Sequence, residues 1–417
     1  MLASRRRFLQ TALGSSTLLS AGLTVPAFLA RSAWAASGPP GGQESGAGEK
    51  ILVVVQLSGG NDGLSTVVPF ADDGYGRNRI VLRIPNEQVL KLNDQLGLHP
   101  QMTGFKKLFE SQRLSIVQGV GYPNPDRSHF RSMDIWHTAK PEREDKTDGW
   151  LGRCIDCGPR EAGQDVPALH LGPNQLPLAL VSQRTPVPSI ESMAGFRLQT
   201  AGGALPLSAL GQLAEAARPD APPLLDFLRR STLNAYASSA QVQEALKEER
   251  SAAAYPDFAL AQKLKQIAQL IDAKLSTRLY YVSLDGFDTH ANQGPAQAAL
   301  LNQLSASVTA FVEDLAQRGH SDRVLVVCFS EFGRRVRENA SQGTDHGTAA
   351  PVFLAGGRVA GGLIGAHPSL SDLDGEGDLK FHTDFRRLYA SLLDGWLGCP
   401  SEKVLGQRFE PLAILKG

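Results

Sequence analysis

Three apolar, β-branched segments constrain the fold of this chain more than any other feature. They cover residues 51–57, 278–284 and 323–329 (ILVVVQL, RLYYVSL and RVLVVCF), and each is followed by small or polar residues. A strand with apolar side chains on both faces has to be covered on both faces, as in a parallel sheet between two layers of helices. Helical patterns alternate with these segments, so we predict an α/β fold with a mostly parallel sheet and helices on both faces.

The remaining elements are predicted from apolar periodicity and from turn residues. Further strands are expected at residues 114–120, 168–171, 178–181 and 351–355. Helices are expected at 100–112, from Ser128 onward, at 294–318 and at 384–396. The stretch at about 207–273 has a helical pattern broken by prolines, and we interpret it as a helical insertion in a single domain that covers residues 50–417.

Residues 1–35 have the pattern of an export signal rather than of a folded segment. Arg5, Arg6 and Arg7 precede Phe-Leu, an apolar run follows, and the segment closes with Ala-Trp-Ala. The paired arginines resemble a twin-arginine signal; an ordinary secretion signal and a retained anchor are the alternatives. Glycine and serine interrupt the apolar run, so we expect no stable membrane anchor after cleavage. Residues 36–49 then form a flexible linker. The expected partner is the twin-arginine export machinery, and the expected location is periplasmic or secreted.

The charge balance argues against a nucleic-acid-binding protein. The chain has 42 Lys and Arg and 42 Asp and Glu, for a net charge of zero. Four of the arginines lie in the first 35 residues, which contain no acidic residue, so the remainder has 38 basic against 42 acidic side chains, or −4. A protein that binds the phosphate backbone normally has a basic excess. We therefore expect no nucleic-acid partner.

Four cysteines are too few for a disulfide scaffold. Cys154 and Cys157 have CxxC spacing, Cys328 lies within an apolar strand pattern, and Cys399 lies near the end of the chain. Incidental thiols, a disulfide within the CxxC loop, and metal binding all remain open for the first pair. No second CxxC is present to complete a four-thiolate zinc site.

Carboxylates and imidazoles follow the three buried strands. Asp62 comes after the first strand, Asp288 and His290 after the second, and Asp345 and His346 one loop beyond the third. In open α/β sheets, ligands bind beyond the carboxyl ends of the strands. These side chains therefore predict a shared metal site. Imidazole favours zinc, whereas carboxylates also accept manganese, magnesium or calcium.

Ser128 opens the helix that follows strand 114–120. A hydroxyl at a helix N-terminus and next to a divalent ion would be an activated nucleophile, and two ions about 3.5–4 Å apart would stabilise the attacking and leaving oxygens of a phosphoryl group. An ordinary serine N-cap is the alternative. The role of His129 has three alternatives: a metal ligand, a proton donor or an exposed helix residue.

Glu331 and Arg334 also have alternative roles. They could orient the site, bind an anion, or form a structural ion pair.

Several motifs in this order resemble family 1501 of domains of unknown function. They are LSGGNDGL (57–64), GYP with RSHF (121–130), GFDTH (286–290), and SEFGR with GTDHG (330–347). The resemblance covers roughly residues 50–415. That family is exported, commonly by the twin-arginine route, and is similar to a branch of the alkaline phosphatase and sulfatase superfamily.

The resemblance implies a set of roles by order along the chain. Asp62 corresponds to the early metal-binding aspartate and Ser128 to the nucleophile, with Ser132 and Thr138 as nearby alternatives. In this correspondence, Asp288 and His290 bind one metal, and Asp345 and His346 bind the other. The late histidine corresponds to His382, with Asp384 as an alternative. The Asp-x-His spacing at 288–290 departs from the longer spacing usual in phosphatases.

Two functions from different classes follow from these observations. The first is an exported metal-dependent hydrolase of phosphate or sulfate esters, with a small anionic ester as substrate. Its candidate catalytic residues are Ser128, His129 and Arg334, and its metal ligands are the aspartates and histidines named above. The second is a binding or assembly protein that has the same fold and no catalytic activity.

Overall fold

The computed structural model describes residues 49–142, 147–158, 167–172, 175–185, 187–191, 199–200, 203–204, 253–273, 275 and 277–417. The predicted export signal, the linker up to residue 48 and most of the predicted insertion lie outside the described residues. The last part of that insertion, which is described, contains a helix as expected, α10 (Ala259–Asp272).

A mixed, mostly parallel sheet of nine strands forms the centre of the described chain, in the order β13-β5-β12-β11-β1-β10-β6-β7, with β14 beside β5. Its strands are β1 (Ile51–Ser58), β5 (Leu114–Gly121), β6 (Ala168–Leu171), β7 (Ser189–Ile190), β10 (Leu279–Asp285), β11 (Val324–Ser330), β12 (Ala350–Ala355), β13 (Gly362–Ile364) and β14 (Thr383–Asp384). Only β12 among these strands runs against its neighbours. The predicted sheet is therefore confirmed.

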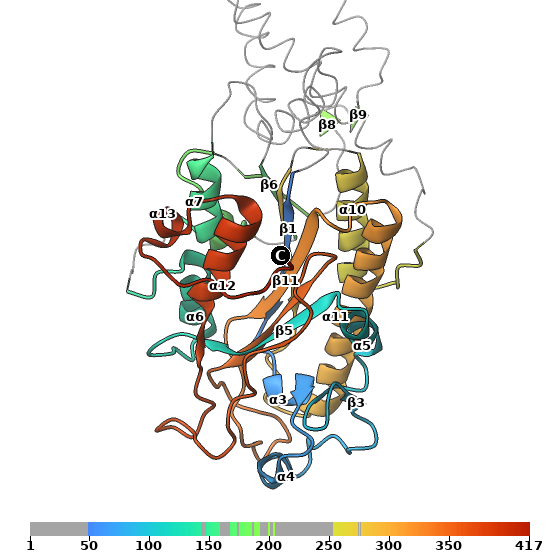
Figure 1. The fold of residues 1–417 in the computed structure, drawn as a ribbon, viewed down its shortest axis with the longest axis vertical. Coiled ribbons are helices and arrows are strands. Elements are labelled where there is room, and N and C mark those ends of the chain that lie inside the picture. Colours follow the sequence, from blue (N-terminus) through green and yellow to red (C-terminus); the bar gives the residue numbers. More distant parts are fainter. Residues whose placement is uncertain are drawn as a thin grey trace, which may run out of the picture.

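Helices cover both faces of this sheet (Figure 1). One layer contains α5 (Thr103–Glu110), α10 and α11 (Gln293–Gln317). The other contains α6 (His129–Thr138), α7 (Trp150–Cys157), α12 (Phe385–Leu392) and α13 (Ser401–Leu405). Alternate side chains of β1 enter two different cores, Val53 and Val55 on the side of α5, α10 and α11, and Leu52 and Val54 on the side of α6, α7 and α12. This two-sided burial explains the unbroken apolar pattern of the strand.

Smaller elements complete the described chain. The helix α3 (Gly63–Thr66) follows β1, and α4 (Asp73–Asn78) comes shortly after it. The strands β2 (Val67–Val68), β3 (Leu90–Lys91) and β4 (Gly97–Leu98) form a three-stranded sheet, and β8 (Gln199–Thr200) pairs with β9 (Gly203–Ala204). No helix of the described residues is both long enough and apolar enough to cross a bilayer.

Two predicted elements differ from the structure. Residues 178–181 were expected as a strand but contain a 3-10 turn, η1 (Leu178–Leu180). Pro177 precedes this turn, and the backbone N–H of Leu180 donates to the Pro177 carbonyl 2.9 Å away, so the segment bonds to itself rather than to a neighbouring strand. The helix expected at 384–396 is α12 followed by a π turn, η2 (Leu393–Leu397).

A disulfide joins Cys154 on α7 to Cys399, 245 residues further along the chain. Both cysteines belong to the core between α7 and α12. A disulfide within the CxxC motif, one of the alternatives left open by the sequence, is wrong, because Cys157 is an exposed free thiol. Cys328 is a buried free thiol. The partner of Cys154 was missed because the two residues are distant in sequence and meet only when the last helices pack on α7.

Removing this disulfide should destabilise the protein. The bond closes a long loop and so restricts the unfolded chain, and its loss should lower the free energy of unfolding by up to about 5 kcal/mol. Urea unfolding of a Cys154→Ser/Cys399→Ser variant measures this change. Cys157→Ser is the matched control on the same helix and should stay within about 0.5 kcal/mol of the parent. Equal stability of the two variants would contradict a stabilising role of the bond.

Candidate metal centre

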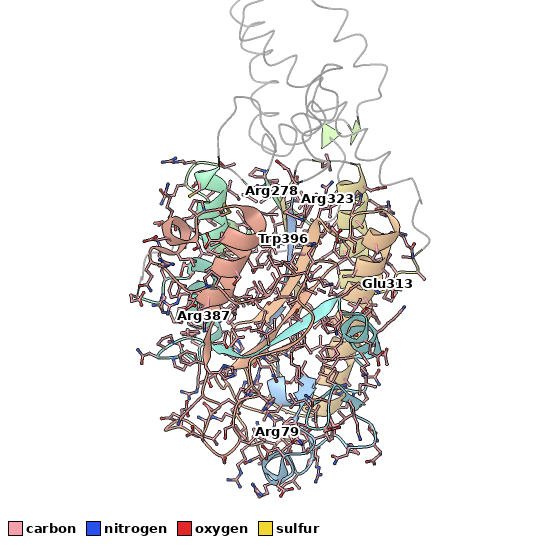
Figure 2. All side chains as sticks on the ribbon, viewed as in Figure 1. Arg79, Arg278, Glu313, Arg323, Arg387 and Trp396 are labelled. Atoms are coloured by element: carbon pink, nitrogen blue, oxygen red, sulfur yellow. A yellow bond between two sulfur atoms is a disulfide. The ribbon has the colours of Figure 1, made fainter. Side chains whose placement is uncertain are left out.

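The three long parallel strands end side by side, and their loops lie at that end of the sheet. Ser58 of β1 is in register with Asp285 of β10, and Leu57 is in register with Ser330 of β11. Figure 2 shows Arg79 toward the end where β1 leads into α3, whereas Arg278 and Arg323, which precede β10 and β11, lie at the opposite end. The candidate site is therefore at the carboxyl edge, as the sequence predicted.

Three imidazoles meet one carboxylate at this edge. The Nε2 atoms of His129, His290 and His346 lie 3.3, 3.0 and 3.1 Å from Oδ1 of Asp288. His129 begins α6, Asp288 and His290 lie between β10 and α11, and His346 lies between β11 and β12. Within the described residues, one ligand atom each from His129, Asp288 and His346 lie within 4.8 Å of one another. These three donors are of the types that bind zinc, and Nε2 of His290 lies next to two of them, Asp288 and His346.

Each of these imidazoles is oriented by an oxygen on its far side. Nδ1 of His129 lies 2.8 Å from Oε1 of Glu331, and Nδ1 of His290 lies 3.2 Å from Oδ1 of Asp345. Nδ1 of His346 lies 2.7 Å from the backbone carbonyl of Arg127. A carboxylate or carbonyl oxygen only accepts, so each Nδ1 is the donor and each Nε2 presents a lone pair toward Asp288. This outer set of oxygens is typical of metal-binding histidines.

Two further observations on the histidine Nε2 atoms support a cation at this point. Nε2 of His129 is buried and has no hydrogen-bond partner. Nε2 of His290 lies only 2.9 Å from Nε2 of His346. Two lone pairs that face each other at this distance repel, and a cation shared by both removes that repulsion. The donors present therefore fit a divalent metal ion.

Arg334 and Glu331 contact the cluster from its buried side. The Arg334 guanidinium is fully buried and donates to Oδ1 of Asp288 at 2.7 Å and to the carbonyls of Gly59 and Gly60. Glu331 accepts from the Gly59 N–H at 2.8 Å as well as from His129. Both side chains thus attach a ligand of the cluster to the loop after β1, which supports the orienting role, and Arg334 does so through an ion pair with Asp288.

The charges around the cluster shift the pKa values of its members. Partial burial acts to raise the pKa of Asp288, but the hydrogen bond and the charge of the Arg334 guanidinium outweigh it and hold that pKa well below its ordinary range. The hydrogen bond to Glu331 raises the pKa of His129. Burial lowers the pKa of His346 and so favours its neutral form. Asp288 and His346 are therefore held in the forms that bind metal, an ionised carboxylate and a neutral imidazole, whereas the shift at His129 favours its protonated form.

Asp345 lies next to the cluster, and its Oδ1 accepts from both His290 and Asn339. It therefore orients a histidine in this structure. The side chains of Asp288, His290 and Asp345 are 48, 44 and 54% exposed, so the centre opens to the surface.

Asp62 is held away from this centre, in contrast to the predicted ligand role. It is fully buried and pairs with Arg79 through both oxygens, at 2.6 and 2.9 Å. Ser65 and Gln293 donate to the same carboxylate, and its Oδ1 caps α3 through the Leu64 N–H. The carboxylate that was predicted to bind metal is thus occupied by a guanidinium and by neutral donors.

His382 and Asp384 also have partners outside the cluster. Nδ1 of His382 lies 2.9 Å from Oγ1 of Thr383, and its Nε2 lies 2.8 Å from the carbonyl of Ala366. Asp384 caps α12 and pairs with Arg386 at 2.6 Å. Neither prediction of a late ligand is supported by these contacts.

Ser128 is the N-cap residue of α6, as the sequence predicted, and it is exposed. Its backbone N–H donates to Asp126, and its side chain makes no capping hydrogen bond. Arg127, which precedes it, accepts a hydrogen bond from His346 through its carbonyl, and His129 follows it, so Ser128 lies between two residues that contact the cluster.

The two alternative nucleophiles have structural partners. Ser132 is buried and hydrogen-bonded to Tyr122 and to the Glu331 carbonyl. Thr138 donates to the Asp134 carbonyl one turn back in the same helix.

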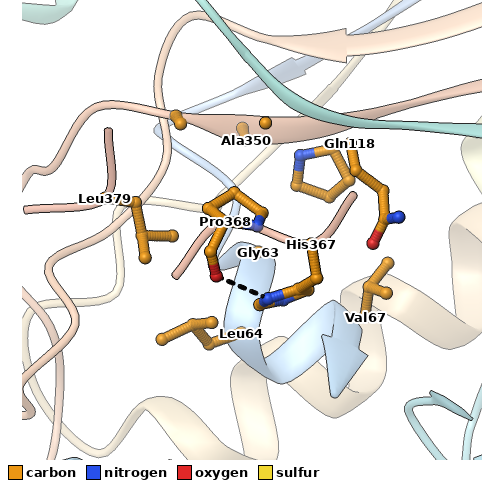
Figure 3. A pocket seen from close by; sticks show the side chains of 11 residues that line it. Gly63, Leu64, Val67, Gln118, Ala350, His367, Pro368 and Leu379 are labelled. Atoms are coloured by element: carbon orange, nitrogen blue, oxygen red, sulfur yellow. Dashed lines mark hydrogen bonds between the residues drawn. The ribbon is translucent and has the colours of Figure 1, made fainter. Parts of the chain in front are cut away.

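Figure 3 shows a small pocket next to α3. Leu64 and Val67 on the α3 side line it, together with Gln118 of β5, Ala350 of β12 and His367. Nδ1 of His367 faces the carbonyl of Pro368 at 2.8 Å. None of the residues that line this pocket belongs to the metal cluster.

The sequence motifs identify the family of this chain. The model of a family described as protein of unknown function (DUF1501) matches residues 49–404. The chain belongs to the DUF1501 family. No curated protein matches it.

Solved structures with a similar arrangement share little sequence with this DUF1501 protein. The C-terminal periplasmic domain of EptC from Escherichia coli, in complex with Zn, is 10% identical, with 74% of each chain covered and a TM-score of 0.32. The lipoteichoic acid synthase LtaP from Listeria monocytogenes is 9% identical, over 77% of this chain and 67% of that chain, with a TM-score of 0.32. The phosphonate monoester hydrolase from Silicibacter pomeroyi is 10% identical, over 87 and 78%, with a TM-score of 0.32.

Proposed function

We propose that this protein is an exported, metal-dependent hydrolase of phosphate or sulfate esters. The observation that carries the proposal is the convergence of three imidazole Nε2 atoms on Oδ1 of Asp288, with each Nδ1 bound to an oxygen. The choice of ester rests on the motif resemblance to the alkaline phosphatase and sulfatase superfamily. Export by the twin-arginine machinery to the periplasm or beyond rests on residues 1–35.

The residues of the cluster have separate tasks in this proposal. His129, Asp288, His290 and His346 would hold one divalent ion, with zinc the first choice from the imidazole content. When bound, such an ion polarises an ester oxygen and lowers the pKa of a water ligand. Arg334 fixes Asp288, while Glu331 and Asp345 fix the histidines. We propose one ion in place of the two expected from the sequence, because Asp345 accepts from His290 and Asp62 is paired with Arg79.

Elemental analysis of protein purified without chelators tests the metal. The expected result is about one equivalent of a divalent metal per chain. Metal-free protein that also fails to bind zinc, manganese, magnesium or calcium on titration would overturn the proposal. Turnover is then measured with a panel of aryl phosphate, aryl phosphodiester and aryl sulfate substrates, because these differ in charge and leaving group.

Ser128→Ala should lower kcat by several orders of magnitude if Ser128 is the nucleophile of this hydrolase. Metal content and the unfolding midpoint should stay unchanged, because the hydroxyl is exposed and makes no capping bond. The parent should also transfer the phosphoryl or sulfuryl group to added alcohols through a covalent ester. Near-normal turnover by the variant would show instead that a water molecule attacks the ester directly.

The second candidate is a metal-binding or assembly protein that does not turn over esters. The side chain of Ser128 makes no capping hydrogen bond, and the nitrogen of His129 that faces the cluster points at Asp288, so no general base is seen to activate the serine. The same substrate panel separates the two candidates. Activity that is absent from the metal-loaded parent protein on every substrate favours this second function.

A further inference from the structure

Asp378 lies in an acidic turn that contacts two of the loops of the metal centre. Its side chain is fully buried, and its Oδ2 accepts from Nη2 and Nε of Arg127 at 2.5 and 2.9 Å. Its Oδ1 has no hydrogen-bond partner, and Nε of Arg335 lies 4.0 Å from it. One buried carboxylate thus lies between two guanidinium groups from different loops.

Both arginines connect directly to the metal centre through their backbones. The carbonyl of Arg127 accepts the Nδ1 hydrogen of His346 at 2.7 Å, and the next residues along the chain are Ser128 and His129. The backbone N–H of Arg335 donates to the carbonyl of Asp345 at 3.0 Å. The two segments that contain His129 and His346 therefore both contact the Asp378 carboxylate, through Arg127 and Arg335.

We propose that Asp378 is a positioning residue of the metal centre, which acts by fixing the Arg127 peptide that orients His346. The proposal rests on the metal site proposed above. If the Arg127 carbonyl moves away, Nδ1 of His346 loses its acceptor, and the ring hydrogen is free to move to Nε2, the atom that must bind the metal. An outer contact of this kind is worth about 10–100-fold in metal affinity.

The turn is built to hold Asp378 in place. Its backbone N–H donates to Oδ1 of Asp374 at 2.8 Å, and its carbonyl accepts from the Asp374 N–H at 2.9 Å. Asp374 Oδ2 also lies 3.7 Å from Arg127. Asp372, in the same turn, is 74% exposed and pairs with Lys380, with no contact to either arginine. It therefore provides a matched control of the same charge.

The experiment compares Asp378→Asn with Asp372→Asn in the full mature protein. Zinc affinity, measured by competition with a chromophoric chelator, should fall about tenfold or more in Asp378→Asn and less than about twofold in Asp372→Asn. Arg127→Met tests the same link from the other side and should lower zinc affinity to a similar extent. Equal affinities for the two asparagine variants, or an Arg127→Met variant that binds zinc like the parent, would overturn the proposal.

A measurement without metal separates this inference from the proposed function. Nitrogen-15 NMR of the metal-free parent should show the His346 hydrogen on Nδ1, and Asp378→Asn should shift it partly to Nε2. That shift supports the positioning role even if the parent binds no zinc. Failure of the parent to bind zinc would overturn the proposed function but not the positioning role. An unchanged His346 tautomer in a folded Asp378→Asn protein would overturn the positioning role, whatever the zinc affinity of the parent.

Discussion

Asp288→Ala should release the metal and abolish ester hydrolysis. Asp288 supplies the one carboxylate oxygen on which the three histidines converge, so its loss leaves three neutral donors and removes the negative charge that balances the cation. The loss in metal affinity should exceed about 100-fold, the upper limit for an outer contact. Metal content after dialysis and kcat/KM on the best substrate of the panel are the two measurements.

The fold should tolerate this change. The Asp288 side chain is 48% exposed, and Arg334 keeps its bonds to the carbonyls of Gly59, Gly60 and Thr344. We therefore expect the unfolding midpoint of the metal-free variant to match that of the metal-free parent. Asp285→Ala is the control, because Asp285 is an exposed aspartate three positions earlier and outside the cluster. A full equivalent of tightly bound metal in Asp288→Ala would show that the metal binds elsewhere.

Arg79→Met should cause the largest loss of stability among single substitutions near the site. It leaves the fully buried Asp62 carboxylate without its cation, and breaking a buried pair in this way costs about 3–5 kcal/mol. Arg79 also donates to the carbonyls of Arg335 and Val336, so the loop before Asp345 loses two bonds as well. Urea unfolding with the metal removed measures the difference.

The pH dependence of this loss has a definite sign. Burial acts to raise the pKa of Asp62, but Arg79 and the hydrogen bonds from Ser65 and Gln293 outweigh it and keep the pKa below the ordinary value of about 3.9. Because the folded-state pKa is depressed, the pair stabilises the parent above that ordinary value, and the stability is lost as the pH falls through the folded pKa. In Arg79→Met the buried carboxyl should instead titrate above its ordinary value, so the difference between parent and variant should narrow toward low pH.

Two controls decide whether the cost belongs to the unpaired charge. Arg77→Met replaces an exposed arginine on α4 and should change the free energy of unfolding by less than about 0.5 kcal/mol. The double variant Asp62→Asn/Arg79→Met removes both charges and should recover a large part of the loss. A double variant that is no more stable than Arg79→Met would show that packing or the loop contacts carry the effect.

The main strands of the fold could be predicted from the local pattern of apolar residues. Strands buried on both faces require continuous apolar runs, so β1, β10 and β11 were found to within one residue. The carboxyl ends of parallel strands meet at one edge, and this rule predicted a shared site for Asp62, Asp288, His290, Asp345 and His346. Asp288, His290 and His346 do lie together, because strand direction places the residues after each strand at this edge, whereas Asp62 is paired with Arg79.

The sequence by itself determined the α/β fold with helices on both faces of the sheet, and it placed candidate carboxylates and imidazoles at the carboxyl edge. Only the tertiary structure decided which carboxylates are free to bind a cation. Asp62 and Asp288 follow parallel neighbouring strands in the same way, yet Asp62 is paired with Arg79, while Asp288 receives three imidazoles. The pairings of Cys154 with Cys399 and of Arg127 with Asp378 likewise join residues about 250 positions apart. Such contacts depend on how distant segments pack, and no local periodicity or spacing encodes them.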